Sequence, residues 1–205
     1  MNRTLVRSLG CLFAALFVHP AVSDVEGGPN VLRLGRTVMR WKDDAVQVVV
    51  GYRHAQAHLD KKWILLETCI TATSGKPIEI WREDVSLLAP DGTRLNLPSQ
   101  RRMAQGIPDL RRMLNESSVT RDPLDGYFPF TTREERLGFF AIPGEEIVFE
   151  KVTVNHLTMA CGNLFFESPR DRFEPGIYTL AVENRDIRVR LPLTLGIEGP
   201  LERVR

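Results

Sequence analysis

The residues of this 205-residue chain with the clearest capacity for chemistry are its cysteines. Cys69 lies in the segment LETCITATSG and Cys161 in TMACGNLFFE, while Cys11 is close to the N-terminus. Two thiols such as Cys69 and Cys161 can form a disulfide, share a metal ion or remain separate. Zinc sites built from cysteine use closely spaced pairs, which these two lack. The choice between a disulfide and free thiols therefore depends on the compartment and on the fold.

The first segment of the chain, 1–23, has the pattern of a secretory signal peptide. Two arginines precede an apolar run over 9–18, and small residues precede Asp24. The run has about ten residues, well below the ~20 that a membrane-spanning helix needs. We therefore predict a signal peptide that carries Cys11 with it. The mature chain is expected in the periplasm or outside the cell and does not span the membrane.

An alternation of apolar and polar residues runs through most of the chain from Ala45 onward. A period of two is typical of strands with one buried face and one solvated face, as antiparallel sheets have. Many short strands separated by turn residues indicate an antiparallel β-sandwich. A first short strand is also expected within 32–41. The alternating segments are 46–54, 63–72, 78–80, 85–89, 95–97, 157–166, 178–182 and 187–195.

Two stretches carry a resemblance to known proteins. TATSGKPIEIWREDVSLLAPDGTRLNL and FEPGIYTLAVEN resemble the strand-and-turn segments of bacterial secreted immunoglobulin-like domains, a family that is mostly uncharacterised. The resemblance implies an immunoglobulin-like β-sandwich and an extracytoplasmic location, and it implies no activity. The expected organisation is a signal peptide over 1–23, a leader over 24–44, a sandwich over 45–198 with an insertion at about 98–136, and a tail over 199–205.

The compartment and the strand pattern give different indications for the cysteines. An oxidising compartment and an even number of mature cysteines favour a Cys69–Cys161 disulfide. Such a disulfide would close a loop of roughly 93 residues, worth about 4–5 kcal/mol by the chain-entropy argument. However, Cys69 lies on the less apolar face of its strand and Cys161 on the more apolar face of its own. A bulge at Gly162 or within 66–70 would bring them together, and two separate thiols are the alternative.

The pair His54 and His58 has the spacing of a metal site on a helix. We place the pair, with nearby Asp60, at a strand end and in a turn, where this spacing brings no convergence. These residues are therefore interpreted as solvated loop histidines, and no metal or other cofactor is expected.

Neighbouring carboxylates occur at 134–135 and 145–146. Adjacent residues on a strand point to opposite faces, so neither pair is expected to converge on a substrate. The chain also lacks the motifs of serine nucleophiles, zinc proteases and phosphate-binding loops. No catalytic residue is predicted.

The insertion at about 98–136 is the segment in which a binding surface is expected. A short helix is predicted over 108–114, and aromatic residues follow it. On one interpretation, arginines and aromatics form a contact surface for a protein partner. On the other, nearby acidic residues neutralise the arginines, and the aromatics plug the open end of the sandwich. The candidate residues are Arg111, Arg112, Tyr127, Phe128 and Phe130.

The overall charge of the chain gives no sign of a nucleic-acid partner, since 27 basic residues face 26 acidic ones. We expect a non-enzymatic binding or structural module that contacts another envelope protein. A second hypothesis is a domain that binds a small ligand or polysaccharide on its aromatic residues, and a third is a hydrolase of unrecognised type.

Overall fold

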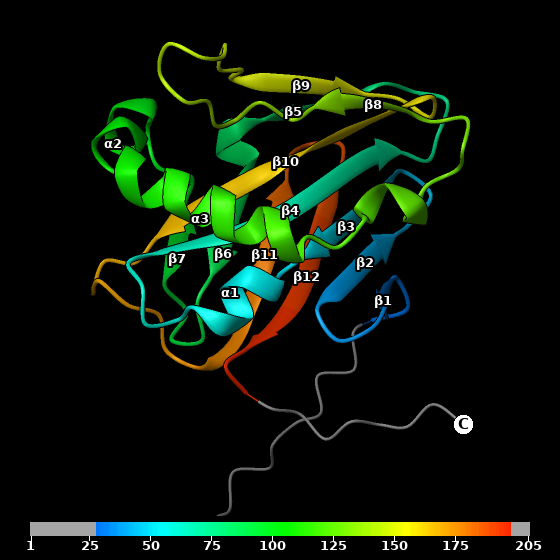
Figure 1. The fold of residues 1–205 in the computed structure, drawn as a ribbon. Helices are drawn as coiled ribbons and strands as arrows, with labels where there is room; N and C mark the ends of the chain where they lie inside the picture. The colour runs from blue at the N-terminus through cyan, green and yellow to red at the C-terminus, as the bar shows by residue number, and fades with distance from the viewer. Residues whose placement is uncertain (1–27, 198–205) are drawn as a thin grey trace, which may run out of the picture.

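The computed structural model of the chain describes residues 28–197 (Figure 1). The predicted signal peptide over 1–23, with Cys11, and the predicted tail over 199–205 lie outside this range. Within it, the protein is built mainly of antiparallel strands, as the alternation predicts, with helices concentrated in the insertion.

The larger sheet has six strands and is centred on β4 and β10. Its neighbours are antiparallel except at one edge, where β8 runs parallel to β10. Two of its strands come from the segment expected to be a leader with one short strand. The order is β1 (Val31–Arg33), β2 (Val38–Lys42), β3 (Val46–Gly51), β4 (Trp63–Ala72), β10 (Thr158–Glu167) and β8 (Arg133–Arg136).

The second sheet has four antiparallel strands, and a two-stranded ribbon accompanies it. A short helix, α1 (Arg53–Ala57), follows β3, and the 3-10 turn η1 (Arg82–Asp84) precedes β6. The four-stranded sheet has the order β12 (Arg188–Leu195), β11 (Gly176–Glu183), β6 (Val85–Leu88) and β7 (Arg94–Asn96), and the ribbon pairs β5 (Ile78–Trp81) with β9 (Lys151–Val154).

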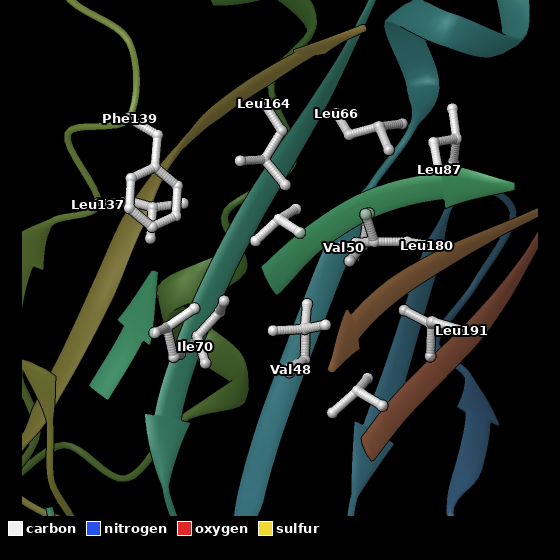
Figure 2. Packing of buried hydrophobic residues seen from close by; sticks show 14 of the residues in the cluster. Val48, Val50, Leu66, Ile70, Leu87, Leu137, Phe139, Leu164, Leu180 and Leu191 are labelled. Atoms are coloured by element: carbon white, nitrogen blue, oxygen red, sulfur yellow. The ribbon is translucent and has the colours of Figure 1, made fainter. Parts of the chain in front are cut away.

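The main core lies where the two larger sheets face each other. Figure 2 shows Val48 and Val50 from one sheet close to Leu191 and Leu180 from the other. These residues come from alternate positions of their strands, so the predicted period of two places them together. Full burial of one such side chain stabilises the fold by roughly 1.5–3 kcal/mol.

The insertion forms a further layer over the outer face of the six-stranded sheet (Figure 1). It contains α2 (Gln100–Gln105), α3 (Ile107–Thr120) and the 3-10 turn η2 (Leu124–Tyr127). The Ser99 hydroxyl accepts a hydrogen bond from the Arg102 amide at 3.2 Å and caps α2. Pro108 lies in the first turn of α3, where its missing N–H is tolerated. The helix predicted over 108–114 is thus the first half of a longer one.

This layer corrects the prediction that each strand has one solvated face. Every residue of β4 is buried. On its outer face, Trp63 and Leu65 pack with Leu110 and Met113 of α3. A strand covered on both sides no longer needs a polar face, and these two apolar residues were the sequence signal for the cover.

The edge strand β8 was not predicted, and its sequence, Arg-Glu-Glu-Arg, has no apolar alternation. It forms by pairing in parallel with the end of β10, from Arg133 opposite Thr158 to Arg136 opposite Cys161. Tertiary pairing therefore overrides a local preference that does not favour a strand.

The predicted bulge at Gly162 or within 66–70 is wrong. The β4–β10 ladder is continuous from Met159 opposite Thr71 to Glu167 opposite Trp63. Gly162 has a different role in this regular ladder. A Cβ atom built there would lie 2.9 Å from the Cβ of Leu137, closer than packed carbon atoms approach. The absent side chain lets the segment after β8 pack against β10.

We predict that Gly162→Ala destabilises the protein by about 1–3 kcal/mol, because Leu137 must shift to make room for the new methyl group. Gly75→Ala is the matched control, since no atom lies within 4 Å of a Cβ built there. Chemical denaturation of both variants measures the change. Equal stability of the Gly162 variant and the wild type would contradict the close packing.

Candidate functional site

The disulfide between Cys69 and Cys161 is present, which confirms the predicted pairing. The two residues are direct partners in the β4–β10 ladder, with their Cα atoms 4.1 Å apart. Antiparallel partners that do not exchange backbone hydrogen bonds lie this close, and their side chains share one face. The expectation of different environments is wrong, because both cysteines face the insertion and are buried there.

The cover over the disulfide comes mainly from η2. Leu124 and Phe128 form a small apolar cluster with the disulfide, together with Val49 and Met159. Phe128 is only 7% exposed. It acts as a plug, as the second interpretation of the aromatics holds, but it covers a sheet face and not the open end of a sandwich.

A cavity of about 300 Å³ opens beside the disulfide. Its charged groups are Arg121, Asp125 and Glu134, the last contributed by β8. Among residues 28–197, neither Asp125 nor Glu134 forms an ion pair within 4 Å. The cavity therefore combines the apolar disulfide with two carboxylates and one guanidinium. Its lining residues are Cys69, Arg121, Pro123, Leu124, Asp125, Glu134 and Cys161.

Glu67 is a buried carboxyl on the same face of β4, two residues before Cys69. Burial raises its pKa to about 7, and the positive charge of Arg121 opposes this rise. Gly51 is its partner in the neighbouring strand, and a Cβ there would lie 3.3 Å from a carboxylate oxygen of Glu67. The absence of a side chain at Gly51 thus leaves space for the carboxylate of Glu67.

The segment after α3 is fixed above Glu67 by Asp122. One Asp122 oxygen lies 2.7 Å from the guanidinium of Arg53, and the other accepts a hydrogen bond from the Thr37 hydroxyl at 3.1 Å. These contacts connect the insertion to α1 and to the start of β2. Glu67, Asp122 and Asp125 were not predicted as site residues. The apolar residues beside Glu67 on the outer face were the available signal that this face is covered.

The predicted binding surface is not assembled as one site. Arg111 pairs with Glu145 and Arg112 with Asp109, each at 2.8 Å, in agreement with the interpretation that acidic residues neutralise them. Tyr127 is partly exposed, and its hydroxyl donates weakly to the Leu34 carbonyl at 3.5 Å. Phe130 is fully exposed. None of these residues lines the cavity beside the disulfide.

The neighbouring carboxylates also have separate surroundings. Glu134 lines the cavity, while Glu135 pairs with Arg133 at 2.7 Å. Glu145 and Glu146 pair with different arginines, Arg111 and Arg136. The two carboxylates of each pair therefore have different neighbours. Strand alternation predicts this for Glu134 and Glu135, which lie in β8.

The histidines contradict the interpretation as loop residues. His54 belongs to α1 and His58 caps its C-terminus, so their rings stack with centroids 4.2 Å apart. Glu116 of α3 approaches His54 at 3.4 Å, whereas Asp60 pairs with Lys61. Burial lowers the pKa of His54, and the hydrogen bond to Glu116 partly offsets that change.

Comparisons with known proteins gave little. No protein-family model matches the chain, and no curated protein matches it. Among solved structures, the chain is similar to a Bacillus subtilis protein described as a putative lipoprotein (ycdA), with 16% identity and a TM-score of 0.38. The match covers 76% of this chain and 38% of the Bacillus chain, so the chain spans less than two thirds of that protein.

None of the helices between residues 28 and 197 has the length and apolar character needed to cross a membrane.

The buried Glu67 predicts a specific pH dependence of stability. Its folded-state pKa of about 7 exceeds the ordinary value of 4.5, so the folded state binds this proton more tightly than the unfolded state. Its contribution to stability is therefore lost as the pH rises between these two values. Glu67→Gln removes this titrating group. Above this pH range, the free energy of unfolding of the variant should exceed that of the wild type by about 3 kcal/mol, and below the range the two should be similar.

Denaturation midpoints of the wild type and the Glu67→Gln variant across this pH range provide the measurement. Glu83→Gln, which removes an exposed carboxylate, is the control and should keep the wild-type pH profile. Parallel profiles for the wild type and Glu67→Gln would mean that Glu67 does not titrate as a buried acid.

Proposed function

We propose that this protein is a non-enzymatic binding module of the periplasm or the extracellular space that contacts another envelope protein. The contact surface is a docking strip, defined as β8 with Phe130 and Leu157 at one end and Ile147 and Phe149 at the other. One observation carries the proposal: β8 is an edge strand whose outer backbone groups have no partner among residues 28–197.

The direction of the free backbone groups follows from the ladder. The Arg133 amide donates to the Leu157 carbonyl and the Leu137 amide to the Cys161 carbonyl, each at 2.8 Å. Backbone groups alternate in direction along a strand, so Glu134 and Arg136 direct theirs away from β10. An added strand can pair with these two residues, which is how many proteins bind an extended peptide.

Exposed apolar side chains flank both ends of β8. Phe130 is fully exposed, and Leu157, at the same end, is about half exposed. At the other end, the Phe149 amide donates to the Gly138 carbonyl at 2.8 Å, and the exposed side chain of Ile147 is two residues away. Apolar residues around a polar strand give a partner surface to bury at each end of the added strand.

Charge indicates the chemistry of the partner. Glu134 of β8 and Asp125 line the cavity beside the disulfide, and Arg121, the cation nearby, interacts with Glu67. A lysine or arginine on the added strand, opposite Glu134, would place its cation between the two carboxylates. The partner is therefore an extended protein segment with a basic residue between apolar ones.

A small-ligand function is the second candidate, and the volume of the cavity supports it, since about 300 Å³ is at the lower end of ligand pockets. The expected stacking platform for a polysaccharide is not supported, because Phe128 is buried and Tyr127 and Phe130 lie outside the cavity. A hydrolase has the least support, since the cavity lining offers carboxylates without a hydroxyl, free thiol or imidazole beside them.

The extracytoplasmic location and an immunoglobulin-like fold are parts of the same proposal. The disulfide supports the location, since disulfides persist in oxidising compartments. Two facing antiparallel sheets and the turn sequences support the fold. The disulfide here lies within one sheet, whereas antibody domains join their two sheets with it.

The docking strip predicts a defined peptide preference. A labelled peptide of alternating valine and threonine with a central lysine should bind the wild type at least tenfold more tightly than its central-glutamate analogue. Glu134→Gln should abolish this preference, because it removes the charge and keeps the backbone amide. Fluorescence anisotropy measures all four affinities.

Glu134→Pro tests whether the peptide binds by backbone pairing with β8, separately from the charge of Glu134. Proline removes only the outward amide of residue 134, so the β8–β10 ladder keeps its hydrogen bonds and peptide binding is lost. Glu134→Gln, which keeps this outward amide, is the control and should still bind the peptide. Peptide binding that survives Glu134→Pro, or no preference for lysine in the wild type, would overturn the proposal.

A further inference from the structure

We propose that His54, His58 and Glu116 form a binding site for a divalent transition-metal cation such as Zn²⁺. One ligand atom from each residue lies within 4.8 Å of those of the other two. Two imidazoles and a carboxylate are a common ligand set for zinc, which accepts water as a fourth ligand. The site is separate from the docking strip and from the cavity beside the disulfide.

The backbone of α1 brings the two imidazoles together. His54 lies within the helix and His58 is four residues further, at its C-terminal cap. Residues four apart share one helix face. Glu116 reaches the same point from α3, so the three ligands connect the insertion to the sandwich.

A hydrogen bond orients His58 for metal binding. Its Nδ1 donates to the backbone carbonyl of His54 at 2.9 Å, which leaves the lone pair on Nε2 available. Metal-binding histidines commonly donate their second nitrogen to a carbonyl or carboxylate in this way. The rings are now stacked at 19°, and His58 is half-buried, so it has room to tilt from the stack towards a shared ion.

His54 is held beside Glu116. Its side chain is only 3% exposed, and its Nε2 lies 3.4 Å from a carboxylate oxygen of Glu116. A cation between these two atoms would be ligated by both of them. A cavity of about 60 Å³ lined in part by His54 and Glu116 has space for an ion with its water.

The cations around the site are each neutralised. Lys61 pairs with Asp60 at 2.9 Å, and Lys62 with Asp171 at 2.7 Å. Arg112 pairs with Asp109 at 2.8 Å and is 3.9 Å from Glu116. Glu116 therefore keeps most of its charge for an incoming metal ion.

Titration calorimetry of ZnCl₂ into the purified full chain without a histidine tag tests the site. We expect one Zn²⁺ per chain, with at least tenfold weaker binding for His58→Ala and for Glu116→Gln. Both residues are partly exposed, so these variants should fold. His156→Ala, at an exposed histidine elsewhere in the protein, is the matched control and should bind as the wild type does.

A thermal-unfolding readout excludes a merely structural role for the cluster. Zn²⁺ should raise the melting temperature of the wild type and of His156→Ala. It should not change the melting temperatures of His58→Ala and Glu116→Gln. Absence of zinc binding to the wild type would overturn the proposal. Binding that both site variants retain, or that His156→Ala removes, would do the same.

Discussion

The burial of β4 on both faces is the constraint on which the rest of this structure depends. One face meets the opposing sheet, and the insertion covers the other. A strand placed between two layers must match both of them, so its register is fixed strongly, because a slip of one residue would exchange the two faces. The disulfide follows from this register. Cys69 and Cys161 meet because they are ladder partners, and they are protected because η2 covers that face. The bond reinforces an alignment that packing already determines.

The same cover explains why the polar groups of interest gather in one layer. The outer face of β4 is apolar beneath α3, polar at Glu67, and closed by the disulfide beneath η2. Helices and turns cannot match a pleated sheet everywhere, and the remaining gaps hold the two cavities. A carboxyl trapped between such layers shifts its pKa upwards unless a cation is close. Arg121 supplies part of that compensation for Glu67, and Arg53 holds Asp122 nearby. The insertion therefore creates the electrostatic features of the protein as well as covering its sheet.

The sequence predicted most of the strands that face the main core, because there one period of two corresponds to one buried face, but it missed β9, whose Val152 and Val154 also lie in that core. It did not predict β8, whose four charged residues form a strand only because the end of β10 is available to pair with them. It also placed His54 and His58 in a loop, since a five-residue helix gives too few turns for a periodic signal. The disulfide could be inferred from the compartment, whereas its geometry could not, because only Trp63 and Leu65 indicated that the face of β4 with Cys69 is also buried. The role of Glu116 could not be predicted, because His54, which it contacts, lies 62 residues earlier in the chain.

The charged side chains of β8 affect which strands can pair with its free edge. A free edge strand pairs with other strands indiscriminately unless charged side chains limit its contacts. In β8, Arg133 is neutralised by Glu135, and Arg136 by Glu146, so the strand has little net repulsion along most of its length. Glu134 is different, because it faces the cavity together with Asp125 and no cation within 4 Å pairs with it among residues 28–197. A passing apolar strand would bury this carboxylate without compensation, which costs free energy, whereas a strand with a basic residue would not. If the protein binds a partner as proposed, the carboxylate that limits unspecific pairing at this edge would also select that partner.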